Sequence, residues 1–201
     1  MKQLVKDALI LTAITLIAGL LLGVVYEVTK APIAAANEAA TQAAYREVFA
    51  DADKFVAVDG FDSEAATGVV AADYAEDKIL NCVQALDVSG NPVGYVVTVV
   101  SSAGYGGNIT FHVGIQNDGT VNGYSITDIS ETAGLGMNAK GEKFSSQFVN
   151  KLVDKFTVVK SGAASESDIQ AISGATITSR AMTNGVNAAI TYFNTLEGGA
   201  Q

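Results

Sequence analysis

An uncharged apolar run near the N-terminus leaves few structures open to the start of this chain. Residues 8–26 read ALILTAITLIAGLLLGVVY and contain no Asp, Glu, Lys or Arg. At about 1.5 Å per residue, a helix of this length spans roughly the hydrocarbon core of a bilayer. A surface helix of a soluble domain would have a polar face, which this run lacks. The pattern therefore predicts a membrane-spanning helix.

A cleaved signal peptide is the alternative interpretation of this run. Its apolar core is normally about 7–15 residues long, and the small residues 34–36 that resemble a cleavage site lie well past the run. An uncleaved anchor is therefore favoured. Lys2 and Lys6 precede the run, whereas Glu27 and Lys30 follow it. This small bias predicts a single-pass protein of the cytoplasmic (inner) membrane, with its N-terminus in the cytoplasm and the rest of the chain on the extracytoplasmic side.

The remainder of the chain is acidic and poor in residues for metal or disulfide chemistry. Beyond residue 30, 9 basic and 19 acidic residues leave a net charge of −10. Such a surface repels nucleic acid and anionic lipid headgroups, so neither is an expected partner. Cys82 and His112 are the only cysteine and histidine. A disulfide within the chain, a thiolate metal cluster and a histidine-based triad therefore lack their parts, and we predict no metal-binding and no catalytic residue.

Both of these residues have ordinary structural interpretations. Cys82 lies in an apolar run and is expected to be a buried small hydrophobic residue. His112 lies in an alternating segment that predicts a strand, where a single histidine is much more often structural or solvent-facing than a ligand. The stretch from Asp51 to Asp77 holds eight carboxylates. It lacks the Gly and terminal Glu of an EF-hand, so we interpret it as a solvated face.

Residue patterns after the apolar run predict a single α+β domain. The Ala- and Glu-rich residues 33–48 predict a helix that continues from the membrane as a stalk. Strands are predicted over 93–100, 109–116 and 121–129, and Asn117-Asp118-Gly119 is a hairpin turn between the last two. Further along, the patterns predict a helix over 142–153, a short strand over 156–159 and a final helix over about 177–196.

These elements predict a twisted antiparallel sheet flanked by helices, preceded by a single N-terminal transmembrane helix. We divide the chain into an anchor (1–30), a stalk helix with an acidic segment (31–78) and the main folded domain (79–201).

The run Ser173-Gly174-Ala175-Thr176 joins a short strand-like stretch to the final helix. Amides at the start of a helix lack intrahelical partners, and the positive end of the helix dipole attracts a phosphate. Gly174 and Ala175 would let a phosphate approach the backbone, while Ser173 or Thr176 would place a hydroxyl beside it. A plain helix N-cap explains the same residues, so local chemistry leaves both interpretations open.

The same run resembles the flavinylation motif of the FMN-binding domain family, Asp-x-x-Ser/Thr-Gly-Ala-Thr. In that family the last Thr carries FMN covalently through a phosphoester, attached by a dedicated flavin transferase that uses FAD. The resemblance implies that Thr176 is the modified residue, with Ser173, Gly174 and Ala175 shaping the turn. The family's Asp falls on Gln170 here, and the nearest carboxylate is Asp168.

Two Gly-rich blocks, residues 104–109 and 131–136, strengthen this resemblance. In order and spacing they are similar to blocks of the G subunits of Rnf complexes, which are membrane ferredoxin:NAD⁺ oxidoreductases. The related C subunit of the sodium-pumping NADH:quinone oxidoreductase shares the flavinylation motif but is typically longer. The usual Pro of the second block is Ala133 in this chain. The end of the apolar run, residues 26–33, also resembles the G subunit, so the resemblance covers nearly the whole chain.

The resemblance implies that residues 79–201 form an FMN-binding domain and that the second block lies against the isoalloxazine ring. The cofactor contacts implied there are Glu131, Thr132, Gly134, Leu135 and Gly136. It further implies an electron-transfer subunit whose partners are the other Rnf subunits, in a complex that couples electron flow to Na⁺ or H⁺ translocation. Two alternatives stay open: a stand-alone anchored flavoprotein, and a non-redox anchored binding domain in which Ser173 and Thr176 are only helix caps.

Overall fold

The computed structural model describes residues 1–196, and the chain divides into two compact units, Met1–Gln42 and Ala43–Gln201. Helix α1 (Lys2–Val48) forms the first unit, and its last residues, 43–48, belong to the second. It is long and apolar enough to cross a membrane, and protein buries none of its most apolar window. The predicted apolar helix and stalk helix are therefore confirmed as one continuous element, which contains Pro32.

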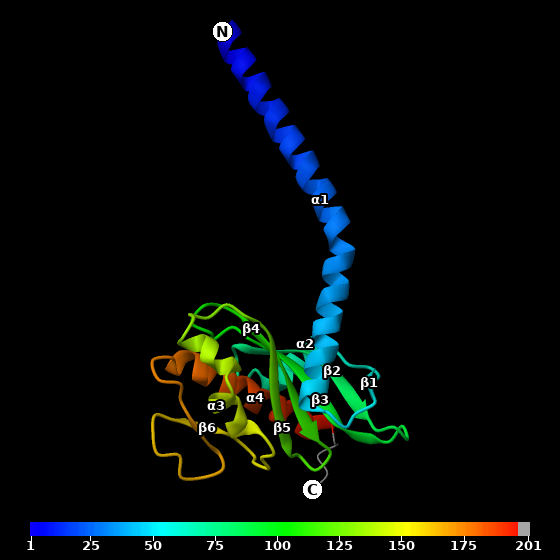
Figure 1. Ribbon diagram of the computed structural model, residues 1–201, viewed down its shortest axis with the longest axis vertical. Coiled ribbons are helices and arrows are strands. Elements are labelled where there is room, and N and C mark those ends of the chain that lie inside the picture. The colour runs from blue at the N-terminus through cyan, green and yellow to red at the C-terminus, as the bar shows by residue number, and fades with distance from the viewer. Residues whose placement is uncertain (197–201) are drawn as a thin grey trace. The chain divides into compact units, whose positions relative to one another are not determined.

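The second unit is built on a five-stranded antiparallel sheet (Figure 1). Its strands lie side by side in chain order: β1 (Lys54–Ala57), β2 (Asp77–Leu86), β3 (Pro92–Ser101), β4 (Ile109–Gln116) and β5 (Val121–Ile129). The predicted strands 109–116 and 121–129 coincide with β4 and β5. Gly119, with φ of 89°, turns the hairpin between them, as expected for a position that favours left-handed backbone. The predicted fold class is confirmed.

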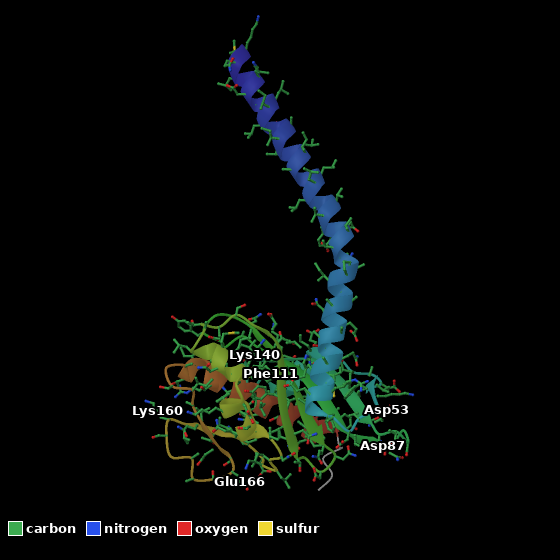
Figure 2. All side chains as sticks on the ribbon, viewed as in Figure 1. Asp53, Asp87, Phe111, Lys140, Lys160 and Glu166 are labelled. Carbon is green, nitrogen blue, oxygen red and sulfur yellow. The ribbon has the colours of Figure 1, made fainter. Side chains whose placement is uncertain are left out.

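Helix α4 (Thr176–Leu196) packs on one face of this sheet, together with the shorter α2 (Ser63–Val70). The close approach of α4 to the sheet depends on Gly185, because a Cβ at that position would lie 2.4 Å from the Phe111 Cζ atom and 3.2 Å from the Val99 Cγ1 atom. Phe111 lies inside the unit, whereas Asp53, Asp87, Lys160 and Glu166 lie toward its edges (Figure 2). This packing fixes where α4 begins relative to the strands.

The end of α1 packs on the opposite face of the sheet. Tyr45 and Val48, with the following Phe49, form a second apolar cluster with strand residues that include Val83 and Val96. The Asn122 side chain of β5 donates to the Val48 carbonyl at 2.9 Å, so polar contacts also hold this end of the helix.

Cys82 is buried as predicted, and of the two roles left open for His112, structural or solvent-facing, the structure shows the structural one. The His112 ring is 3% exposed, lies edge-on to Tyr45, and has Thr98 Oγ1 3.0 Å from Nδ1 and Thr127 Oγ1 3.2 Å from Nε2. Burial lowers the pKa of His112 to about 4, so the ring is neutral near pH 7. Cys82 is fully buried, and burial raises the pKa of its thiol to about 12.

Against the expectation of a solvated face, the acidic segment 51–78 contains regular secondary structure and one buried carboxylate. It contains β1 and α2, and Asp62 caps α2 by accepting from the amides of Glu64 and Ala65. Asp77 contradicts the expectation of solvation, because it is only 2% exposed. Burial raises the pKa of Asp77 to about 6, and its Oδ1 atom has no hydrogen-bond partner within residues 1–196.

The predicted helix over 142–153 is wrong beyond its first turns. Helix α3 covers Glu142–Ser145 and a 3₁₀ turn, η2, covers Ser146–Phe148. Asn150 then adopts a φ of 56°, and Lys151 makes two backbone hydrogen bonds with Val121 at 2.8 and 3.1 Å. The chain leaves the helix at this point because the edge of the sheet supplies better partners for its backbone.

A small parallel pair, β6 (Thr157–Val159) and β7 (Asp168–Gln170), brings the chain back to α4. Asn187 of α4 holds the start of this segment, because its side-chain amide donates to the Phe156 carbonyl at 2.9 Å and its oxygen accepts from the Phe156 amide at 2.8 Å. The predicted strand 156–159 is thus present except for its first residue. From β7 the chain passes directly into the turn that opens α4.

Candidate functional site

The turn before α4 presents backbone amides at a fixed position. Gly174 has a φ of 76°, which glycine adopts at little cost. The Ala175 amide donates to the Ile172 carbonyl at 3.0 Å, and α4 begins at Thr176. The first amides of a helix lack intrahelical acceptors, so those at the start of α4 are available to an anion.

Ser179 braces this turn from within the helix. Its hydroxyl is fully buried, donates to the Ala175 carbonyl at 2.9 Å and accepts from the Ile172 amide at 2.9 Å. The hydroxyl of Ser179 therefore ties the residues before the turn to the first turn of α4. The side chain of Thr176, in contrast, is half-buried and makes no hydrogen bond with residues 1–196.

A cavity of about 610 Å³ opens beside this turn. Three separate segments line it: the loop before β4, the loop after β5 and the start of α4. Its lining residues are Tyr105, Glu131, Thr132, Leu135, Gly136 and the run 174–178. Tyr105, Leu135 and Ile177 are 72%, 42% and 53% exposed, so large apolar side chains stand at its mouth. This volume and apolar character suit a small organic ligand.

Glu131 is the buried carboxylate of this cavity. It is 8% exposed, and its Oε1 atom accepts from the Gly106 amide at 3.2 Å. A Cβ on Gly136 would lie 2.5 Å from Glu131 Oε2 and 2.7 Å from Thr178 Oγ1. Glycine at 136 is therefore required for the loop after β5 to lie against α4, with the Glu131 carboxylate between them.

A second cavity, of about 680 Å³, lies on the other side of the same loop. Gly134 and Ser173, two of the nine predicted cofactor-binding residues, line this cavity and not the first. The other predicted residues all line the first one: Glu131, Thr132, Leu135, Gly136, Gly174, Ala175 and Thr176. The structure thus brings seven of the predicted residues to one cavity and places two on its neighbour.

Gln170 stands where the flavinylation motif has Asp, and its backbone is held by a side chain. The Gln147 Oε1 atom accepts from the Gln170 amide at 2.7 Å, and Gln147 Nε2 donates to the Gln170 carbonyl at 3.3 Å. The Gln170 side chain itself is exposed and lines the second cavity.

The nearest carboxylate to the motif, Asp168, is held within its own loop. Asp168 Oδ2 accepts from the amides of Ala164 and Ser165 at 2.9 and 3.0 Å. These bonds hold the pKa of Asp168 below its usual value and direct the carboxylate into its own loop.

Sequence reasoning missed three residues of the first cavity: Tyr105, Ile177 and Thr178. Ile177 and Thr178 directly follow the motif, so their position at the start of a helix could have indicated them. Tyr105 belongs to the first Gly-rich block, which reaches the cavity through long-range contacts: the pairing of Ile109 with Ile129 and the bond between Gly106 and Glu131.

Comparisons with known proteins agree with this arrangement. A model of the FMN-binding domain matches residues 104–191, which contain every segment that lines the first cavity. A model of the RnfG N-terminal region matches residues 1–48, which contain the whole of α1. The fold and site therefore define an FMN-binding domain protein with an N-terminal helix suited to membrane anchoring.

Two relatives resemble nearly the whole chain. The G subunit of the proton-translocating ferredoxin:NAD⁺ oxidoreductase complex of Clostridium ljungdahlii is 37% identical over 94% of this chain and 91% of its own. The G subunit of the Na⁺-translocating ferredoxin:NAD⁺ oxidoreductase complex of Acetobacterium woodii is 34% identical over 97% of this chain and 94% of its own. The protein belongs to the family of G subunits of the ion-translocating ferredoxin:NAD⁺ oxidoreductase (Rnf) complexes.

Two solved structures share the fold. NqrC of Shewanella oneidensis has a TM-score of 0.51 at 18% identity and covers 76% of this chain and 88% of its own. The C subunit of the Na⁺-translocating NADH-quinone reductase of Parabacteroides distasonis has a TM-score of 0.53 at 23% identity, with 75% and 80% covered. At these identities the likeness concerns the fold alone, and it agrees with the expected relation to the quinone-reductase protein.

The residues of the first cavity fit FMN. Its volume is in the range of small-molecule and cofactor sites. The amides at the start of α4 suit a phosphate, and the apolar side chains of Leu135 and Ile177 suit a flat ring system. Gly136 and Gly174 keep the walls thin where a ring would need close approach to the backbone.

Proposed function

We propose that this protein is an electron-transfer subunit that carries FMN covalently on Thr176. It acts within a membrane complex that moves electrons from ferredoxin to NAD⁺ and couples this transfer to translocation of Na⁺ or H⁺. The observation that carries the proposal is the cavity that joins the Thr176 turn to the 131–136 loop. One relative is named for protons and the other for Na⁺, so the ion is left open between them. The chain itself is an electron carrier, and the net reaction belongs to the whole complex.

Thr176 is the attachment residue in this proposal, through a phosphoester to its hydroxyl. The start of α4 favours the phosphate through free amides and the helix dipole. Gly174 and Ala175 keep the turn small, and Ser173 shapes it from the side of the second cavity. A dedicated flavin transferase is the maturation partner. The half-buried position of the Thr176 side chain supports this proposal, because its hydroxyl has no competing hydrogen bond with residues 1–196.

The 131–136 loop provides the ring contacts in this proposal. Leu135 supplies an apolar wall, Gly136 allows close approach, and backbone groups near Thr132 bind the polar edge of the ring, whereas Gly134 lines the second cavity and is left out of these contacts. When bound, FMN supplies the redox chemistry by accepting and releasing electrons. The chain sets the position of the ring, its access to water and the local charge. A covalent tether suits a cofactor on the extracytoplasmic side, where dissociated FMN would be lost.

The proposed arrangement in the membrane follows the charges that flank the apolar run. Residues 1–30 form the anchor with the N-terminus in the cytoplasm, 31–78 form the connecting segment, and 79–201 form the FMN-binding domain outside. A reporter enzyme that is active only outside the cytoplasm, fused to the C-terminal end, is expected to be active. Activity of a cytoplasm-specific reporter at the same place would contradict this orientation.

The deciding experiment measures intact mass and ultraviolet in-gel fluorescence of the denatured full-length chain. The protein is produced together with the flavin transferase and extracted from membranes. We expect a fluorescent band that is heavier by one FMN less water, and its loss in Thr176→Ala. Ser165→Ala, which removes an exposed hydroxyl outside the motif, is the matched control and keeps the band.

Three outcomes separate the candidate functions. A dark wild-type band of unmodified mass would return Thr176 to the role of a helix cap. Fluorescence that persists in Thr176→Ala would move the attachment elsewhere. A fluorescent protein that purifies without multi-spanning membrane partners would favour a stand-alone carrier over a subunit.

A further inference from the structure

Glu131 is the only acidic or basic residue among those that line the first cavity. It is 8% exposed, and the single salt bridge within residues 1–196, between Lys151 and Glu166, does not involve it. A carboxylate in a protein wall acts on its surroundings more strongly than one in water, because the local dielectric constant is lower. Glu131 therefore places negative charge in the wall of the cavity, with no salt-bridge partner among residues 1–196.

We propose that the Glu131 carboxylate tunes the reduction potential of the flavin, making it more negative than it would be in the same site without this charge. This inference rests on the proposed function, since it requires FMN in this cavity. An electron that enters the cavity adds negative charge there, and a nearby fixed carboxylate disfavours that change. No atom or electron passes to or from Glu131, which acts only through its charge and position.

The position of the carboxylate is fixed by its neighbours. Oε1 accepts from the Gly106 amide, while Oε2 faces Gly136 and Thr178, where any Cβ at 136 would collide with it. Gly104 is also close, with a Cβ there 3.0 Å from Oε1. The absence of side chains at Gly104 and Gly136 makes the space that the carboxylate occupies, and the Gly106 amide holds it there, so its charge stays in the cavity wall.

Other acidic residues of the unit act less on the cavity. Glu142 at the start of α3 is exposed and lines neither cavity. Mobile ions screen an exposed charge within about 10 Å at 0.1 M salt and about 3 Å at 1 M. A buried charge against the ligand is screened much less. Salt therefore distinguishes the effect of Glu131 from that of the general acidity of the domain.

The test compares Glu131→Gln with Glu142→Gln in the full-length, flavin-loaded protein. Both changes remove one negative charge, and glutamine at 131 keeps an oxygen that can accept from the Gly106 amide. Flavin loading is measured first, as fluorescence of the denatured band. The midpoint potential is then measured by dye-mediated titration of the flavin absorbance, at low salt and at 1 M salt.

We expect Glu131→Gln to shift the midpoint potential to a more positive value, and to keep most of this shift at 1 M salt. Glu142→Gln is expected to give a smaller shift that high salt removes. Glu131→Asp keeps the charge and is expected to stay nearer to wild type than Glu131→Gln. Because the titration follows only molecules that bear flavin, incomplete loading does not obscure the result.

The inference is overturned if loaded Glu131→Gln has the wild-type potential, or shifts no more than Glu142→Gln. It is also overturned if Glu131→Gln is unfolded or folds without taking up any flavin, because Glu131 would then be required for folding or for flavin attachment. A wild-type protein that carries no flavin would instead contradict the proposed function.

Discussion

Helices α1 and α4 are both long enough to cross a bilayer, but their side chains meet different surroundings. In α1, the large apolar residues from Leu4 to Val28 are 49–75% exposed. In α4, 13 of 21 residues are buried, and four of these are the polar residues Thr178, Ser179, Thr183 and Asn187. A lipid-facing helix needs apolar side chains on all sides, whereas a core helix tolerates polar ones that have partners. Hydrophobicity alone would thus rank the wrong helix as the core of the domain.

The strongest test of this comparison introduces the same charge into both helices. Ile190→Asp in α4, where the side chain is 4% exposed, should destabilise the second unit by about 3–5 kcal/mol because the new charge has no partner. Ile17→Asp in α1 should cost about 3 kcal/mol of membrane insertion and leave the unfolding of the second unit unchanged. Thermal unfolding in detergent and carbonate extraction of membranes measure the two effects. Equal loss of unfolding temperature in both variants would refute the distinction.

Polar side chains provide the next test. Asn187→Leu should cost about 2–3 kcal/mol, because it leaves the buried amide and carbonyl of Phe156 without partners. Thr15→Val in α1 loses only a bond to the Thr12 carbonyl of its own helix, and should change stability by less than about 0.5 kcal/mol. Denaturant unfolding of the two variants checks the pair. A wild-type midpoint for Asn187→Leu would mean that β6 is held by other contacts.

Glycines in the two helices give a smaller contrast. Gly185→Ala should destabilise the second unit by about 1–2 kcal/mol, because crowding against Phe111 outweighs the gain in helix propensity. Gly23 has nothing within 4 Å of an added Cβ, so Gly23→Ala should leave that unit unchanged. The measurement is the unfolding midpoint of each variant, and a stabilised Gly185→Ala protein would contradict the packing described here.

The smallest change in the stability of the wild-type protein is expected from a change of pH, because the contributions of two buried groups vary with pH in opposite directions. Asp77 lies on the α4 face of the sheet, and His112 lies on the face that the end of α1 covers. The pKa of Asp77 is raised from 3.8 to about 6, so its contribution to stability is full below pH 3.8 and is lost as pH rises through about 6. The pKa of His112 is lowered from 6.5 to about 4, so its contribution is full above pH 6.5 and is lost as pH falls through about 4.

Single variants should separate these two contributions. Relative to wild type, Asp77→Asn should lose stability as the pH falls from 6 to 4, whereas His112→Gln should gain stability over the same range. Denaturant midpoints at several pH values measure both trends. Parallel curves for wild type and either variant would assign the pH dependence to other groups.

Much of the sheet could be predicted from the sequence because its signals are local. The alternation of β4 and β5 and the turn at Gly119 depend on neighbouring residues alone. The end of the 142–153 segment could not, because Phe144 and Phe148 keep helical spacing while Lys151 pairs with Val121 far along the chain. The backbone pairing of a distant edge overrides the local pattern there.

In the candidate site, too, local features could be predicted from the sequence and features that depend on distant contacts could not. The Thr176 turn is a contiguous motif, so sequence alone identifies it. Gly134 and Leu135 are adjacent, yet they line different cavities, and no sequence pattern says on which side of a loop each residue lies. Tyr105 reaches the first cavity through long-range contacts, among them a hydrogen bond between Gly106 and Glu131, which joins segments that are 25 residues apart.

The bonds between Gln147 and the backbone of Gln170 have an evolutionary consequence. The path of the chain into the Thr176 turn is held by contacts that any residue at 170 except proline can make, because they use only its amide and carbonyl. A substitution there that keeps the backbone amide therefore leaves these bonds in place and alters only the exposed side chain. An exchange between Asp and Gln at this position therefore needs no rebuilding of these two backbone bonds.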